Sequence, residues 1–192
     1  MKEMAIDNQT PIQLRPFAKS DIKQLINWVD SPEFLLQWAG RGFSYPLDEA
    51  QLTSLIKKTS EGDPSLLAFT PVISKTGEAL GHVQLSSINR TDRSAAIARV
   101  LVGPKILRNR GLGRKIMEAV LQVGFEKLSL HRIYLNVFDF NHNAIACYEH
   151  LGFQREGLLR DTVRVGNKYW SHFIMSILEE EWRVLNKKTV ST

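Results

Sequence analysis

One stretch past the middle of the chain constrains the fold more than any other, because it joins a strand, a glycine loop and an amphipathic helix. Residues 99–102 form a mostly apolar run, and a loop containing Gly111 and Gly113 follows. Beyond the loop, apolar residues recur at the three- and four-residue spacing of one helix face: Leu112, Ile116, Ala119, Val120 and Val123. We therefore expect a buried strand that leads through a glycine turn into a helix.

The loop has the physical features of an anion site. The first turn of a helix presents unpaired N–H groups and the positive end of the helix dipole, and glycine lets a phosphate approach the backbone closely. Arg108, Arg110, Arg114 and Lys115 add positive charge. The sequence has neither the P-loop pattern nor an opening Rossmann fingerprint. An ordinary strand–helix turn with surface arginines is the alternative interpretation.

The motif from Arg108 to Gly113, Arg-Asn-Arg-Gly-Leu-Gly, resembles the Arg/Gln-x-x-Gly-x-Gly/Ala signature of the GNAT superfamily of N-acyltransferases. Residues 133–153 resemble the second half of the same family's cofactor domain, with a strand, an Asn-rich loop, a short helix with a tyrosine, and Gly-Phe opening another strand. Asn141 or Asn143 can cap that helix, and Gly152 can end it. The tail, residues 168–182, resembles the ribosomal-protein and polyamine acetylating branches.

The resemblance implies the α/β (α+β) fold class, with a single mixed, partly parallel twisted sheet flanked by helices. It implies one domain over residues 1–192, with a core at about 11–182. The residue patterns predict a similar order of elements. Ser20 or Asp21 can cap the first helix. The expected strands are 11–16, 66–74, 79–88, 95–102, 132–138, 153–165 and 170–178, and the expected helices cover 22–29, 33–38, 48 to about 60, the loop helix, the short tyrosine helix and 179–186.

The resemblance also implies acetyl-CoA as cosubstrate, in a cleft where strands 99–102 and 133–138 splay apart. Backbone groups of the first strand would bind the pantetheine arm, and N–H groups of residues 110–114 would bind the pyrophosphate. The implied coenzyme-contacting residues are Val100, Leu101, Val102, Arg108, Asn109, Arg110, Gly111, Leu112, Gly113, Arg114, Asn136, Asn141, Asn143 and Tyr148.

Acyl transfer from a thioester to an amine requires a deprotonated amine, a polarised carbonyl and protonation of the leaving thiolate. From its place in the motif, Tyr148 is the candidate general acid, and Asn136 falls near the thioester. The alternative for Tyr148 is a core tyrosine on an amphipathic helix. Cys147 beside it has no recognisable activating partner for a nucleophilic role.

The general base is not fixed by the sequence. Many family members carry a glutamate on the strand before the phosphate loop, whereas residues 96–100 read Ala-Ile-Ala-Arg-Val and contain no carboxylate. His82 has a suitable intrinsic pKa and is the base that we predict, with Asp139, Glu33 or a water chain as alternatives. A structural role for His82 remains open.

Aromatic residues gather in the N-terminal region, either as core or as the lining of the acceptor site: Trp28, Phe34, Trp38, Phe43 and Tyr45. Arg41 lies among them and could bind a carboxylate or phosphate of the acceptor. We expect no metal, because the five histidines and the one cysteine do not form a ligand set.

Bulk properties limit the remaining options. At 192 residues and 43% hydrophobic, the chain can bury one core. The net charge of +5 leaves a nucleic-acid-binding domain as a weak alternative, since no recognition-helix pattern is present. A single cysteine and the lack of a long apolar run favour a cytoplasmic protein with no membrane partner.

We expect an N-acetyltransferase acting on a primary amine, in a small molecule, polyamine, antibiotic or protein N-terminus. The alternative is a non-catalytic acyl-CoA-binding module. A homodimer is plausible.

Overall fold

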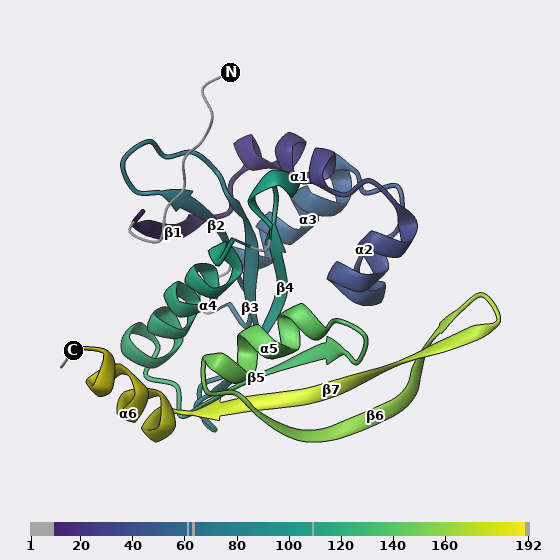
Figure 1. Ribbon diagram of the computed structural model, residues 1–192. Coiled ribbons are helices and arrows are strands. Elements are labelled where there is room, and N and C mark those ends of the chain that lie inside the picture. Colours follow the sequence, from purple (N-terminus) through teal and green to yellow (C-terminus); the bar gives the residue numbers. More distant parts are fainter. Residues whose placement is uncertain (1–9, 61, 63, 109, 191–192) are drawn as a thin grey trace. The chain divides into compact units, whose positions relative to one another are not determined.

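The computed structural model describes residues 10–60, 62, 64–108 and 110–190 (Figure 1). These residues form two compact units. The first unit takes its members from residues 1–84 and 99–120, and the second from residues 85–98 and 121–192. In the described part of the chain, no helix combines the length and apolar character needed to cross a membrane.

Seven strands are hydrogen-bonded in the order β1-β2-β3-β4-β5-β7-β6. The pairs β1–β2, β5–β7 and β6–β7 are antiparallel, and β4–β5 is parallel. The paired register of β4 and β5 covers three residues of each strand and ends at Ala96 and Tyr134. The expected mixed, partly parallel sheet is thus confirmed. The strands are β1 Ile12–Pro16, β2 Leu67–Ile73, β3 Gly81–Asn89, β4 Ser94–Val102, β5 Arg132–Phe138, β6 Gln154–Val165 and β7 Lys168–Leu178.

Three helices of the first unit, α1 (Ile22–Trp28), α2 (Pro32–Ala39) and α3 (Glu49–Thr59), pack around one apolar core. The hydroxyl of Ser31 accepts from the N–H of Phe34, and the carboxylate of Asp48 accepts from the N–H of Gln51. These side chains satisfy donors that a helix start leaves unpaired. The core residues include Leu25, Leu35, Leu52 and Leu101.

The expected cap at Ser20 or Asp21 is wrong in its detail. Asp21 lies in a 3₁₀ turn, Lys19–Asp21, and its side chain makes no capping bond to α1. It is buried instead, and its carboxylate binds the Arg15 guanidinium through two contacts of 2.6 Å. A partner contributed by β1 has therefore replaced the local helix cap.

The second unit is built on β5, β7 and β6, with α5 (His142–His150) and the C-terminal helix α6 (Glu179–Val190). The β6–β7 hairpin is a long curved ribbon in Figure 1 and turns at Gly166, whose φ of +60° suits glycine. The helix α4 (Leu112–Gln122) is followed by a π turn, Val123–Lys127. A Cβ on Gly124 would lie 2.4 Å from Ile133, so this turn packs directly on β5.

Candidate active site

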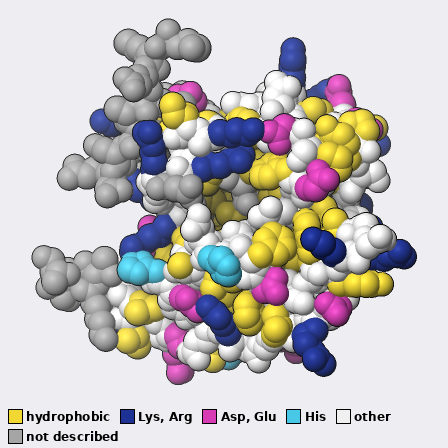
Figure 2. Space-filling model, turned by 45° about the vertical axis from the view of Figure 1, so that its right-hand side comes forward, with side chains coloured by type: hydrophobic (Ala, Val, Ile, Leu, Met, Phe, Trp, Pro, Cys, Tyr) yellow, Lys and Arg dark blue, Asp and Glu magenta, His cyan; other side chains and the backbone are white. Residues whose placement is uncertain are grey.

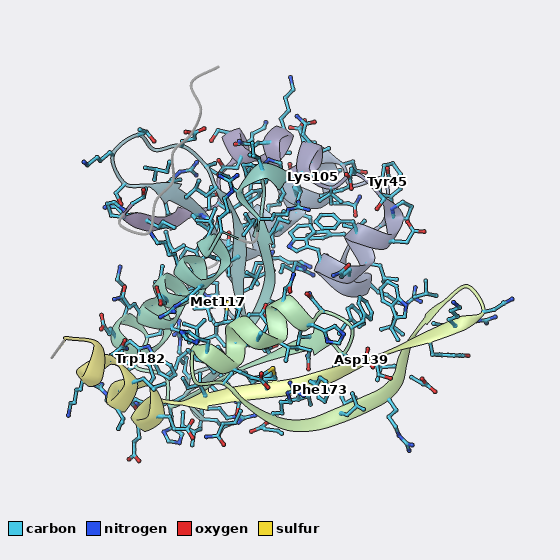
Figure 3. All side chains as sticks on the ribbon, viewed as in Figure 1. Tyr45, Lys105, Met117, Asp139, Phe173 and Trp182 are labelled. Carbon is cyan, nitrogen blue, oxygen red and sulfur yellow. The ribbon has the colours of Figure 1, made fainter. Side chains whose placement is uncertain are left out.

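The predicted phosphate loop lies in the first unit, after β4. A short 3₁₀ turn, Lys105–Leu107, which carries the Lys105 labelled in Figure 3, precedes Gly111, and α4 begins at Leu112. Gly111 has a φ of +79°, the left-handed conformation that favours glycine. Leu107 and Leu112 are both buried and fix the two ends of the loop. The strand–glycine loop–helix prediction is confirmed as local structure, and Asn109 lies outside the described residues.

Most of the positive side chains near this loop bind the protein itself. Arg108 donates to the carbonyls of Val102 (3.0 Å) and Gly103 (3.3 Å) and lies over the Phe34 ring. Arg114 pairs with Glu118 one turn later. Arg108 therefore holds the loop on the end of β4 rather than extending into solvent.

The backbone of the first turn of α4 remains suited to an anion. The N–H of Lys115 bonds the carbonyl of Gly111, so the N–H groups of residues 112–114 precede that first helical bond. A Cβ built on Gly113 meets only one described atom within 4 Å, a Val102 methyl group at 3.8 Å. The protein's own packing thus does not require glycine at this position. Glycine at this position would let a phosphate approach the backbone closely, as the sequence pattern predicts.

Tyr148 lies in the second unit on α5, whose ends follow sequence rules. The side chain of Asn141 caps α5 by accepting from the N–H of Ala144, which decides between the two predicted caps. At the other end, Gly152 has a φ of +94°, and the N–H groups of Phe153 and Gly152 bond the carbonyls of Tyr148 and Glu149. This pair of bonds is the Schellman motif. It fixes the helix end next to the tyrosine.

The chemistry of Tyr148 is set by its surroundings. Its ring packs on Phe153 with centroids 5.9 Å apart, and its hydroxyl has no hydrogen-bond partner among the residues described. Burial, followed by the neighbouring Cys147 thiol, raises the pKa of the Tyr148 phenol. The phenol therefore keeps its proton at neutral pH and remains a hydrogen-bond donor. Asn136 on β5 and Asn143 on α5 are both exposed.

His82 lies in the core of the first unit, fully buried. The rings of Phe17 and Trp38 pack against it at centroid distances of 4.9 and 5.8 Å. Burial, and then the charge of Arg99, lower the pKa of His82 to about 3. The imidazole is therefore neutral at ordinary pH.

The neighbours of His82 also fix its tautomer. The Gln84 carbonyl oxygen accepts from the Arg99 guanidinium at 2.6 Å, so the Gln84 amide nitrogen must be the donor in its 2.8 Å contact with His82 Nε2. The His82 lone pair is thereby engaged, which argues against proton abstraction by His82. We call His82, Gln84, Arg99 and Phe43 the Arg99 cluster.

The other candidate bases remain predictions. Asp139 directly follows the end of β5, where Figure 3 labels it, and its N–H bonds the carbonyl of Ser171. Glu33 is exposed in the first turn of α2. Within the described residues, no group of three or more His, Cys, Asp or Glu side chains is placed to hold a metal ion.

The sequence analysis predicted neither the role of Gln84 nor the contact between the Arg99 side chain and Gln84. A signal was present, because His82 and Gln84 are polar residues at a spacing of two within the otherwise apolar stretch 79–85. Both are fully buried on one face of β3. Such a pair needs internal partners, and Arg99 supplies one of them.

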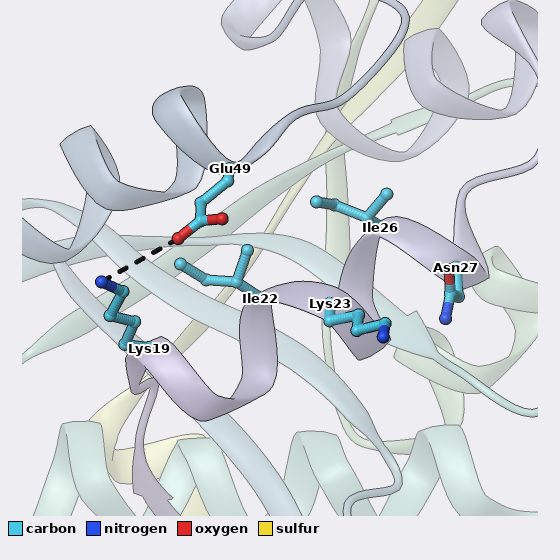
Figure 4. Close-up of a pocket in the computed structure, with 6 residues that line it drawn as sticks. All are labelled: Lys19, Ile22, Lys23, Ile26, Asn27 and Glu49. Atoms are coloured by element: carbon cyan, nitrogen blue, oxygen red, sulfur yellow. Dashed lines mark ion pairs between the residues drawn. The ribbon is translucent and has the colours of Figure 1, made fainter.

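Two surface features lie apart from these residues. Figure 4 shows a pocket with an ion pair at 4.0 Å between Lys19 and Glu49, and none of the predicted site residues lines it. On the face in Figure 2, Lys and Arg side chains are interspersed with Asp and Glu side chains. The pocket lining is Lys19, Ile22, Lys23, Ile26, Asn27 and Glu49.

A mixed sheet, a glycine turn at the start of α4 and a tyrosine on a capped α5 are the features that the sequence resemblance to N-acyltransferases predicts. The comparisons agree. The model of the Acetyltransferase (GNAT) family matches residues 32–153. The chain therefore belongs to the GNAT acetyltransferase family, and it is an N-acetyltransferase.

The chain is similar to acetyltransferases that act on different amines. The chain is 27% identical to spermidine N(1)-acetyltransferase of Escherichia coli K12, over 92% of this chain and 90% of the relative. It is also 27% identical to an aminoglycoside N(6′)-acetyltransferase type 1 of Klebsiella pneumoniae, over 76% and 75% of the two chains. The solved structure of spermidine N-acetyltransferase from Vibrio cholerae with CoA and spermine has a TM-score of 0.77 at 26% identity, covering 89% of this chain and 97% of that one.

Proposed function

We propose that this protein transfers an acetyl group from acetyl-CoA to a primary amine by direct attack within a ternary complex. The observation that carries the proposal is the first turn of α4, where the N–H groups of residues 112–114 precede the first helical bond to a described residue and a Cβ on Gly113 would meet only one described atom, a Val102 methyl group at 3.8 Å. Family membership supplies the coenzyme as the expected anion. The N–H groups from Arg110 to Arg114 would bind the pyrophosphate, with Arg108 holding the loop in place.

The reaction forms a C–N bond at the thioester carbonyl carbon and breaks the C–S bond. The amine nitrogen loses a proton, and the thiolate sulfur gains one. Tyr148 is assigned as the donor of that proton from its place in the family motif, and its raised pKa keeps the phenol protonated at neutral pH. Backbone groups of Val100, Leu101 and Val102 are proposed to bind the pantetheine arm. Asn136 and Asn143 are proposed to contact the coenzyme near its acyl end, and Asn141 is proposed as a further coenzyme-binding residue.

Several wider assignments are part of the same proposal. The whole chain acts as one acetyltransferase domain, since the family match runs through residues of both units. The protein works in the cytoplasm, binds an amine acceptor and needs no metal. A homodimer is the proposed assembly. The first acceptors to test are polyamines and aminoglycosides, because the relatives carry those names.

The test is a thiol-release assay with acetyl-CoA against polyamines, aminoglycosides, amino acids, amino sugars and short peptides. Coenzyme binding is followed in parallel by thermal shift. Thiol release stimulated by one class of amine supports the proposal and supplies the acceptor. Tight coenzyme binding with no release across the whole panel counts against catalysis and favours a binding module. Failure to bind the coenzyme contradicts the assignment of the loop.

A further inference from the structure

Arg99 carries a positive charge that the described protein does not neutralise. Its guanidinium donates to the neutral carbonyl oxygen of Gln84 and lies 4.5 Å from the centroid of the Phe43 ring. No carboxylate among the described residues forms an ion pair with it. By contrast, the guanidinium groups of Arg15 and Arg132 each donate through two nitrogens to one carboxylate, that of Asp21 and of Glu156 respectively.

Holding Arg99 in this way is costly for the folded protein. Burial disfavours an unpaired cation and lowers the pKa of the Arg99 guanidinium. The Arg99 backbone is also in the left-handed region, with a φ of +52°, where a residue with a Cβ is strained. Two such costs at one residue indicate that the arginine serves more than packing.

The neighbours hold the guanidinium in one orientation. The Gln84 side chain accepts a hydrogen bond from the Arg99 guanidinium and also contacts the buried His82 ring. The rings of Phe17 and Trp38 pack against His82. On another side, a Cβ on Gly42 would lie 2.0 Å from an Arg99 terminal nitrogen, so the backbone there packs directly against the fork. Arg99 is nevertheless only partly buried and can be reached from solvent. One terminal nitrogen donates to Gln84, and the N–H groups that Gln84 does not receive remain as donors suited to a carboxylate.

We propose that Arg99 binds a carboxylate of the acceptor, so that this protein acetylates amines that also carry a carboxylate, such as amino acids or peptides. This assignment rests on the N-acetyltransferase function proposed above. An acceptor with several ammonium groups and no anion would meet an uncompensated positive charge at Arg99. The acceptor class therefore differs from the polyamines named for the relatives.

The experiment compares matched acceptors that differ by one carboxylate: lysine with cadaverine, and phenylalanine with phenethylamine. Each is assayed by thiol release with the wild type, Arg99→Gln and Arg99→Lys. Lys57→Gln is the control, because it removes one exposed positive charge at the end of α3 and is not a member of the Arg99 cluster. Thermal unfolding of each variant verifies that it folds, and coenzyme binding is measured beside it.

The expected result is a wild-type preference for the carboxylate member of each pair. Arg99→Gln lowers kcat/KM for that member by about tenfold to a hundredfold, the range for a charged hydrogen bond, mainly through KM. Values for the amines without a carboxylate change by less than about threefold, within the error of such comparisons. Arg99→Lys keeps part of the preference, since it retains charge without the fork. Equal losses for both members, or no wild-type preference, overturn the proposal.

Two further arms separate the possible failures. Phosphoethanolamine is assayed beside ethanolamine, and a stronger preference in that pair overturns the choice of carboxylate over phosphate. If no amine stimulates thiol release, the function proposed above fails, and the subsite is then measured by binding. Phenylacetate and the neutral phenylethanol are titrated against intrinsic tryptophan fluorescence, because Trp38 stacks on Phe43. Saturation by phenylacetate that Arg99→Gln abolishes supports the subsite, whereas equal responses to both compounds overturn it.

Discussion

Two polar regions of the first unit differ in whether a carboxylate pairs with their arginine. At the β1–α1 corner, Arg15 meets Asp21, and the carboxylate also accepts from the N–H of Ala18 and the hydroxyl of Thr70. In the Arg99 cluster, the guanidinium has only a neutral amide and an aromatic ring as described partners. His82 Nδ1 and Trp38 Nε1 beside it are buried without a hydrogen-bond partner among the described residues.

The difference separates two uses of buried polarity. A network in which every group is bonded holds two elements in register, and removing one member leaves the others unsatisfied. A network with donors left over gains little stability, and its free groups are available to a ligand. The first pattern therefore predicts large effects on folding, and the second predicts effects on binding or catalysis.

Tyr148 combines a ring that packs on Phe153 with a hydroxyl that has no hydrogen-bond partner among the described residues. Replacing Tyr148 with Phe keeps the ring contact to Phe153 and removes the proton donor. We expect kcat in the thiol-release assay to fall by about 10²- to 10⁴-fold, the usual contribution of a general acid. Coenzyme affinity and the unfolding temperature should change little. An unchanged kcat would return Tyr148 to a purely structural role.

Asp21→Asn tests the complete network. The substitution removes the charge that Arg15 pairs with and forces an amide against donors, so we expect a loss of about 2–4 kcal/mol in the free energy of unfolding. Chemical denaturation measures it. Asp92→Asn is the matched control, an exposed aspartate whose carboxylate has Asn89 as its one hydrogen-bond partner among the described residues, with an expected change within about 0.5 kcal/mol. Similar effects for the two variants would contradict the distinction between the regions.

Gly113→Val tests the open side of α4. A branched side chain would occupy the space beside the first turn, and we expect coenzyme affinity to fall by about a hundredfold through loss of charged hydrogen bonds. The fold should survive, because the nearest described atom to a Cβ is 3.8 Å away. Gly103→Ala is the contrast: its Cβ would lie 2.3 Å from the Trp28 ring, so it should destabilise the protein by about 1–3 kcal/mol. Calorimetric titration and thermal unfolding measure both effects.

The stability that Asp21 provides should depend on pH in a defined direction. Burial alone would raise the pKa of Asp21, but hydrogen bonds from Arg15, Ala18 and Thr70, with the charge of Arg15, hold that pKa below its usual value. A carboxyl with a lowered folded pKa adds stability above its unfolded pKa of about 3.9, and this stability is lost as pH falls toward the folded value. The gap between wild type and Asp21→Asn should therefore narrow below about pH 5. A gap that widens on acidification would reverse the assigned sign.

Sequence patterns predicted the parts of this molecule that depend on local spacing. The α4 stripe, the caps of α5 and the turn at Gly166 follow from residues close in the chain. The Asp21 network could not be predicted that way, because Thr70 is 49 residues away and competes with the helix end for the same carboxylate. The direction of the Arg99 side chain could not be predicted from sequence spacing either. A single left-handed residue changes which way a strand side chain points, and no pattern of alternation encodes it.

The last variant tests whether the Arg99 cation contributes to the free energy of unfolding. Arg99→Met removes the guanidinium but keeps an unbranched apolar chain to pack on Phe43. It loses one hydrogen bond to Gln84 and also relieves an unpaired, partly buried charge, so the two contributions oppose each other. We expect the free energy of unfolding to change by less than about 1 kcal/mol, measured by the same denaturation as Asp21→Asn. A loss as large as that of Asp21→Asn would show that the cation supports the fold. A small change combined with a lost carboxylate preference would show that the protein keeps Arg99 for its acceptor.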